Sequence, residues 1–229
     1  KWEATTMQNV GFDVSFFKNT LTLSAEYYKN ISYDLLIGVP PASSIGVLDN
    51  TFRNVGGMNS SGFEINLGYN ETIKDFKWAA NLNLSTTHNV VTKLSPNADT
   101  YFGGAYYGGG EISRIIVNEP LWHFYGYQTD GIFQNQAEID AAATQPNSKP
   151  GDIRFKDLNN DKIIDAKDRT NIGNPFPALS YGMSLNASFK GFDMNVLISG
   201  VSGNKIFNVN RFFLDGSDKI YNAGTIVLN

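Results

Sequence analysis

Three stretches of this chain alternate strictly between apolar and polar residues, and each doubles back through a short polar turn. In the first, every second residue from Val10 to Phe16 is apolar, and the residues between are polar or glycine. After Lys18-Asn19-Thr20 the alternation resumes from Leu21 to Tyr27. A period of two is that of a β-strand with two unlike faces, so this pattern predicts a β-hairpin.

The same construction returns twice more along the chain. We therefore predict hairpins at about 8–29, 60–85 and 177–199. The second hairpin is expected to turn through Asn70 to Asp75 and the third at Lys190-Gly191. The segments between hairpins, about 30–61 and 86–177, are long and rich in Gly, Pro, Asn and Asp, which is typical of loops.

The polar faces of the hairpins are unusual because they carry few charges. Only 17% of all residues are Asp, Glu, Lys or Arg, against roughly 25% in an ordinary soluble domain. The polar faces consist mainly of Asn, Ser, Thr and Gly, whereas the opposite faces are apolar. A lipid-facing outside and a hydrated lumen would produce this contrast.

Aromatic residues gather near the hairpin turns. They are Phe16, Phe17, Tyr27, Tyr69, Phe76, Trp78, Phe189 and Phe192. Aromatic rings favour the membrane interface, where an apolar ring body and a polar edge are both satisfied. No apolar run approaches the roughly 18 to 20 residues of a spanning helix, but a transmembrane strand needs only about 9 to 11.

These features together predict an all-β fold, an antiparallel transmembrane β-barrel. Its short turns would lie at one end and its long extracellular loops, about 30–61 and 86–177, at the other. The alternative is a soluble extracellular β-sandwich that binds glycans, since sandwiches also alternate and also have unequal loops.

Composition argues against several functions. The net charge of -4 and the pI near 5.2 offer no basic field for phosphates, so we expect no nucleic-acid partner. The chain has no cysteine, which excludes disulfides and thiolate chemistry. His88 and His123 are the only histidines, and neither has a catalytic or metal-binding motif beside it, so we expect no enzyme.

One acidic segment has the spacing of a calcium loop. Oxygen side chains occupy loop positions 1, 3, 5, 9 and 12, and a backbone carbonyl occupies position 7. These candidate ligands are Asp157, Asn159, Asp161, Ile163 (carbonyl), Asp165 and Asp168. Lys162 replaces the usual glycine and Asp168 the usual bidentate glutamate. The alternative is a turn whose Asp and Asn side chains bond their own backbone, so structural calcium and no metal both remain open.

Four aromatic residues of the longest connection are candidates for contact with a substrate or partner. They are Tyr106, Tyr107, Trp122 and Tyr125. Flat rings can stack on sugar faces, but a loop that packs on its neighbours would use the same residues.

Several phrases resemble the closing part of SusC/RagA-type TonB-dependent transporters. Early phrases are Lys1-Trp2-Glu3, Asn9-Val10-Gly11-Phe12-Asp13, Tyr27-Tyr28 before Asp34-Leu35-Leu36, Asn54-Val55-Gly56 and Gly62-Phe63-Glu64. Later ones are Phe124-Tyr125-Gly126-Tyr127, Asp130-Gly131-Ile132-Phe133-Gln134, Pro150-Gly151-Asp152, the stretch Asp157 to Asp168, Ile172-Gly173-Asn174-Pro175 and Tyr181-Gly182. In order and spacing they cover almost the whole chain.

The resemblance implies an outer-membrane importer of oligosaccharides or peptides. Its expected partners are a SusD-like surface lipoprotein, membrane lipid, and TonB, which would contact an amino-terminal part that this chain lacks. The family's plug domain and final strands are also absent. The chain is therefore expected to be a fragment of a larger barrel, and transporters of this kind have about 22 strands.

Overall fold

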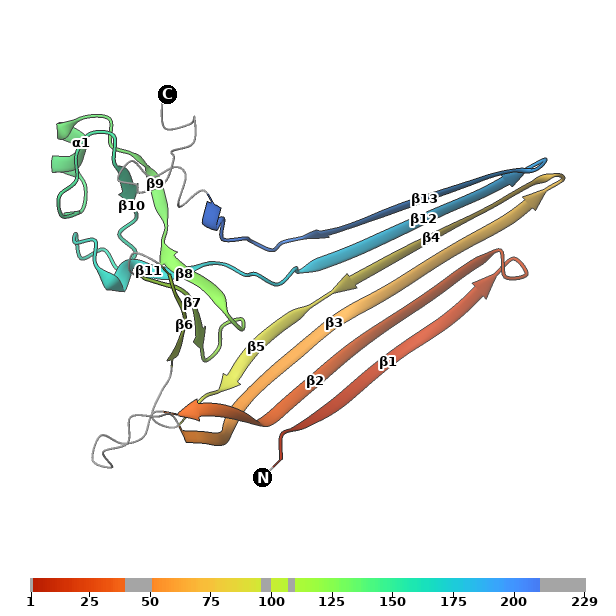
Figure 1. Ribbon diagram of the computed structural model, residues 1–229, viewed down its shortest axis with the longest axis horizontal. Coiled ribbons are helices and arrows are strands. Elements are labelled where there is room, and N and C mark those ends of the chain that lie inside the picture. Colours follow the sequence, from red (N-terminus) through yellow and green to blue (C-terminus); the bar gives the residue numbers. More distant parts are fainter. Residues whose placement is uncertain (1, 40–50, 96–99, 107–109, 211–229) are drawn as a thin grey trace.

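The computed structural model describes residues 2–39, 51–95, 100–106 and 110–210 (Figure 1). Its main part is an antiparallel sheet, here called the wall, in which the strands are ordered β1-β2-β3-β4-β12-β13 and β5 also pairs with β3. The wall strands are β1 (Ala4–Phe16), β2 (Leu21–Val39), β3 (Thr51–Ile73), β4 (Phe76–Thr86), β5 (His88–Lys93), β12 (Leu179–Phe189) and β13 (Phe192–Ser202).

The hairpin turns are short and tight. Ile73 pairs with Phe76, so the second hairpin turns in only two residues, Lys74 and Asp75. The expected turn through Asn70 to Asp75 was too long, because β3 continues through Ile73. The third hairpin turns at Lys190-Gly191, where both residues have positive φ, as the twist of a two-residue hairpin turn requires.

Strands β2 and β3 are much longer than the membrane requires. They contain 19 and 23 residues, against about 9 to 11 for one crossing. The predicted loop at about 30–61 was therefore wrong in extent, since the β2–β3 ladder continues to Val39 and Thr51; residues 40–50 lie outside the described part. Beyond the bilayer both faces of a strand meet water, so the apolar alternation that marks a transmembrane strand is lost.

The wall is open in the described part of the chain. Strands β1 and β13 form its two edges, and each is paired on one side only. Its apolar face is bare: Val10 is 70% exposed and Phe192 80% exposed. No second described sheet covers that face, so the β-sandwich alternative is wrong, and the predicted all-β barrel wall is confirmed as an unclosed segment.

The predicted loop at 86–177 has a fold of its own over most of its length. Beyond β5 it forms what we call the loop module, at the end of the wall opposite the hairpin turns (Figure 1). Its main sheet is ordered β11-β8-β7-β6, and β9 pairs with β10. The module elements are β6 (Thr100–Tyr106), β7 (Gly110–Ile116), β8 (His123–Tyr127), β9 (Thr129–Ile132), α1 (Gln136–Ala141), β10 (Ile153–Phe155), η2 (Ala166–Asp168) and β11 (Arg169–Gly173).

The described buried side chains lie in the module and where it meets β5. They are Val91, Leu94, Ser95, His123, Phe133, Ile164 and Asp168. The wall, in contrast, leaves both faces accessible. A large uncovered apolar surface is unfavourable in water, so this face needs an apolar surrounding. Among the described residues, no helix has the length and hydropathy to cross a membrane.

Candidate functional site

The outer face of the wall is apolar and bounded by aromatic rings at both ends. The turn-side belt comprises Phe16, Tyr69, Phe76, Trp78, Phe189 and Phe192. Tyr27, which was expected near a turn, lies instead in the loop-side belt with Phe63 and Tyr181. Ring centres lie 4.8 Å apart for Tyr69 and Trp78, and 5.0 Å apart for Tyr27 and Phe63. Two belts of this kind mark the two interfaces of a bilayer.

The distance between the belts fits a membrane. Along β3, Phe63 and Ile73 bound the apolar face and are separated by ten residue steps, or about 34 Å at roughly 3.4 Å per residue. A strand tilted by about 40° therefore spans about 26 Å, close to the roughly 25 Å apolar band of outer-membrane barrels.

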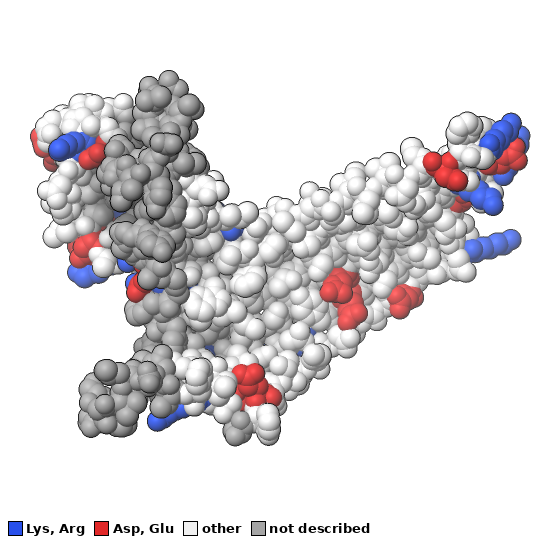
Figure 2. Space-filling view, in the orientation of Figure 1, with Lys and Arg blue, Asp and Glu red and all other residues white. Residues whose placement is uncertain are grey.

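The inner face of the wall is polar but nearly uncharged. One row across the sheet illustrates it: Asp13, Ser24, Asn66, Asn83, Gly182 and Ser199 are successive cross-strand neighbours. The space-filling view of this face shows a broad uncharged surface with isolated acidic patches (Figure 2). Two carboxylates of the inner face are neighbours, because Glu26 pairs directly with Glu64. Glu26 also accepts a 2.6 Å hydrogen bond from Asn9 Nδ2.

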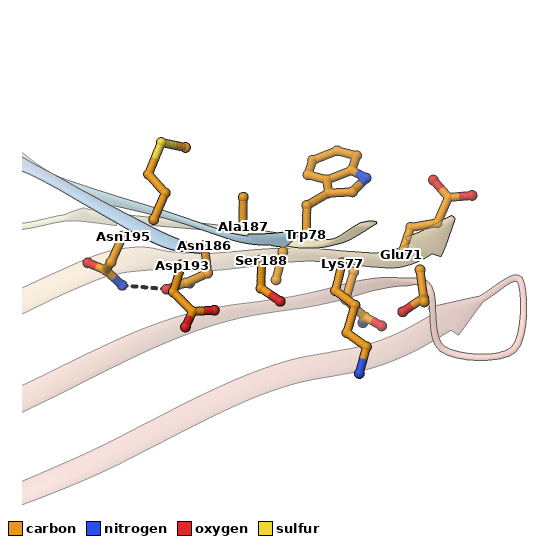
Figure 3. Close-up of a pocket in the computed structure, with 12 residues that line it drawn as sticks. Glu71, Lys77, Trp78, Asn186, Ala187, Ser188, Asp193 and Asn195 are labelled. Carbon is orange, nitrogen blue, oxygen red and sulfur yellow. Dashed lines mark hydrogen bonds between the residues drawn. The ribbon is translucent and has the colours of Figure 1, made fainter. Parts of the chain in front are cut away.

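A hollow at the turn end of the wall shows how the two faces separate (Figure 3). Trp78 and Ala187 point to one side of the sheet, whereas Lys77, Ser188 and Asp193 point to the other. Asn195 donates a hydrogen bond to Asn186 on the polar side. Because its lining residues belong to opposite faces, this hollow is not a pocket in which one ligand could bind.

The loop module is attached to the wall through β5. Backbone bonds join Val91 N to Glu119 O (3.0 Å) and Asn118 N to Val91 O (2.8 Å), and Leu121 N donates to Asn89 Oδ1 (2.8 Å). β5 is itself part of the β3 ladder. The module therefore continues the wall rather than hanging from it as a free loop.

The four aromatic candidates do not form one described cluster. Tyr125 packs inside the module, with the Arg114 guanidinium 3.9 Å from its ring centre and that of Arg169 at 5.4 Å. Trp122 is 38% exposed in the turn before β8. Tyr106 ends β6, but its side chain, like the whole of Tyr107, lies outside the described part.

Sequence reasoning missed the residues that hold this module together. Arg114 and Arg169 stack on Tyr125 from two other strands. Arg114 also forms an ion pair with Glu111, with 2.8 Å between Nη2 and Oε2. His123 is fully buried, with its Nδ1 2.9 Å from the Pro120 carbonyl oxygen. The Glu111–Arg114 and Pro120–His123 contacts are local, but the stacking of Arg114 and Arg169 on Tyr125 joins different strands, so no local pattern in the sequence marks it.

The acidic segment 157–168 folds around its own backbone. Asp157 accepts hydrogen bonds from the N–H groups of Asn160 (2.7 Å) and Lys162 (2.8 Å), and Asp161 accepts one from Ile163 (3.0 Å). Among the described residues, no group of three or more acidic or histidine side chains is arranged to hold a metal ion. This geometry favours the self-bonded turn, and calcium binding here stays an untested prediction.

Asp168 is the buried anchor of that segment. Its two carboxylate oxygens accept 2.9 Å hydrogen bonds from Leu158 N and Asp165 N, and it completes a capping box for η2. The Asp165 N–H holds the pKa of the Asp168 carboxyl below its ordinary value of 3.8, helped by the N–H groups of Leu158 and Asn159 and opposed by burial. The ionised form is therefore the one that the fold stabilises.

We expect this anchor to make the module sensitive to strong acid. A carboxyl whose folded pKa is depressed contributes stability above its unfolded pKa, and that stability is lost as pH falls through the folded pKa. Digestion of the complete receptor with an acid-active protease should therefore spare the module at mildly acidic pH and cut it well below pH 3.8. Asp168→Asn should be cut at both pH values, whereas Asp161→Asn, which alters a more exposed carboxylate, should behave like the wild type.

Comparison with known proteins agrees with this geometry. The family model described as TonB dependent receptor-like, beta-barrel matches residues 1–210. TonB-dependent receptor P3 of Formosa agariphila is 31% identical over 212 residues, which cover 91% of this chain and 21% of that protein. TonB-dependent receptor SusC of Bacteroides thetaiotaomicron is 27% identical over 209 residues, covering 90% and 20%. The chain thus spans about a fifth of the length of these relatives.

Solved structures of the RagAB importer share the fold. The RagAB peptide importer in its open-open state superposes with a TM-score of 0.75 at 22% identity, covering 100% of this chain and 24% of that chain. The RagAB peptide transporter gives a TM-score of 0.72 at 22% identity, covering 93% and 23%. These likenesses concern the fold alone.

Proposed function

Since the chain belongs to the family of TonB-dependent receptor-like β-barrels and its place is the bacterial outer membrane, we propose that it forms part of the wall of a nutrient importer. The imported ligands would be oligosaccharides or peptides. This family consists of receptors and transporters rather than enzymes, and the proposal assigns this chain no catalytic step.

The observation that carries the proposal is the contrast between the two faces of the wall. The outer face offers lipid an apolar band of membrane height, and the inner face offers water a row of neutral hydrogen-bonding groups such as Asn66 and Asn83. Neutral amides and hydroxyls can exchange hydrogen bonds with the polar groups of sugars and peptides. A lumen lined in this way suits the passage of such ligands.

The same proposal includes two protein partners. A SusD-like lipoprotein would lie over the loop-side end of the wall, where the ordered module projects beyond the membrane (Figure 1). TonB would supply energy from the periplasm through a part of the receptor outside this chain. The likeness to SusC supports these assignments.

The test is to obstruct the lumen from this wall and measure uptake. The chain has no cysteine, so Asn66→Cys in a complete receptor free of other cysteines offers one thiol on the inner face. Coupling a bulky maleimide to it should reduce uptake of a labelled peptide or oligosaccharide mixture to the level of cells without the receptor. The physical reason is that the added polymer fills the path that the ligand must take.

Leu67→Cys is the matched control, because it is the next residue on the same strand and faces lipid. A polar maleimide should not reach the lipid-facing thiol of Leu67→Cys. The thiol should therefore stay unlabelled, and uptake should stay normal. If labelled Asn66→Cys cells import as well as unlabelled cells, the lumen beside this wall is not the route. Separate peptide and oligosaccharide mixtures would show which class is carried.

A further inference from the structure

Each of the three hairpin turns carries a lysine in the left-handed backbone conformation. The φ angles are 56° for Lys18, 55° for Lys74 and 46° for Lys190. Glycine, asparagine and aspartate adopt this conformation most readily, and they are the residues expected in tight hairpin turns. Lysine offers the backbone no advantage there, so its presence in all three turns needs a reason outside the turn itself.

Each of the three lysines lies within two residues of an aromatic residue of the turn-side belt. Lys18 follows Phe16 by two residues, Lys74 precedes Phe76 by two, and Lys190 follows Phe189 directly. The Lys190 ammonium is 5.3 Å from the centre of the Phe189 ring, on the lipid-facing side of β12. Because the aromatic rings mark the membrane interface, the ammonium groups stand at the depth of the lipid headgroups.

The three ammonium groups form no ion pair within the described part of the chain. All three side chains are exposed, and no described carboxylate forms an ion pair with any of them. Of the nearby acids, Asp75 follows Lys74 directly, Glu71 accepts a 2.8 Å hydrogen bond from Tyr69 Oη, and Asp193 lies on the inner face. The space-filling view shows basic side chains standing out from the turn end of the wall, with acidic side chains among them (Figure 2).

We propose that Lys18, Lys74 and Lys190 form a lysine collar that binds the phosphate groups of anionic phospholipids in the periplasmic leaflet. Short turns of outer-membrane barrels face the periplasm, which fixes the leaflet. Each ammonium group meets a phosphate while its aliphatic stem lies along the aromatic belt. The collar therefore sets how deep this wall sits in the bilayer. It depends on the membrane placement of the wall and not on which ligand the receptor imports.

The collar is tested by asking which lipids remain with the complete receptor. Wild type and the triple variant Lys18→Gln, Lys74→Gln, Lys190→Gln are reconstituted with equal amounts of phosphatidylglycerol and phosphatidylcholine, and the retained lipids are counted by native mass spectrometry. One lysine near an anionic surface corresponds to about a fivefold local enrichment. We expect phosphatidylglycerol to be retained about fivefold over phosphatidylcholine by wild type, and about equally with it by the variant.

The matched control removes three exposed lysines from the loop module: Lys149→Gln, Lys156→Gln and Lys162→Gln. It changes the net charge equally and should keep the wild-type lipid ratio. Equal retention of the two lipids by wild type, or undiminished preference in the collar variant, overturns the proposal. The proposal is also overturned if the collar variant keeps the wild-type lipid ratio but no longer binds an acidic periplasmic protein that the wild type binds. Uptake measured on the same samples shows separately whether the receptor still imports.

Discussion

Gly62→Ala is expected to prevent most copies of the complete receptor from reaching the folded barrel. Gly62 lies where β3 exchanges its partner, because Ser61 pairs with β5 and Glu64 with β4. A Cβ at this position would overlap the carbonyl oxygen of Thr86 and meet Tyr28 Oη at 2.7 Å. The Thr86 oxygen belongs to the backbone and cannot rotate away, so we expect a loss of about 3 kcal/mol or more.

The folded fraction can be read from the difference in gel migration between heated and unheated outer-membrane samples. Gly182→Ala is the matched control: it is also a wall glycine, but a Cβ there would meet nothing closer than 3.9 Å. We expect this control to fold like the wild type. If the Gly62→Ala receptor folds as well as Gly182→Ala, the packing around Gly62, where β3 changes its partner from β5 to β4, must be much looser than in the structure.

Leu82→Arg and Asn83→Arg should have very different effects although they alter adjacent residues. Leu82 faces outward near the middle of β4, paired with Leu67 and Met183, whereas Asn83 faces inward, paired with Asn66 and Gly182. An arginine facing lipid near the midplane of a barrel costs about 2–4 kcal/mol. An arginine facing the lumen remains hydrated.

This difference can be measured as the free energy of folding of the complete receptor into lipid vesicles along a urea series. Asn83→Arg should change it by less than about 1 kcal/mol, since a substitution exposed to water is usually mild. Similar losses for both variants would contradict the assignment of the apolar face to lipid. A larger loss for Asn83→Arg would reverse the two faces.

The membrane-spanning part of the fold could be predicted from the sequence because its signal is local. Successive side chains of a strand point to opposite faces, so Phe12 lies on the lipid side while its neighbours Gly11 and Asp13 lie on the other. This alternation is visible within the sequence of one strand. The signal fades where strands leave the bilayer, so the alternation stops before β2 ends and resumes only after β3 has begun. It also fades near the turns, where Glu71 interrupts the apolar face and the second turn was expected to be longer than it is.

The loop module could not be predicted for the opposite reason. Its order depends on pairs such as Arg169 with Tyr125 and Val91 with Glu119, which lie far apart in the chain. The aromatic candidates were chosen for their chemistry, and for Tyr125 the described neighbours are cations of the module itself. For the acidic segment, the sequence left a calcium loop and a self-bonded turn open, because spacing alone does not distinguish oxygens that bind an ion from oxygens that accept backbone N–H groups.

The two unpaired edges of the wall restrict how such a structure can enter a bilayer. In hydrocarbon, every main-chain amide without a partner costs several kcal/mol, and within the described residues β1 and β13 each have one edge on which no strand pairs with them. The wall by itself is therefore not stable in lipid, and the strands that neighbour β1 and β13 in a complete barrel must pair with them for it to stay there.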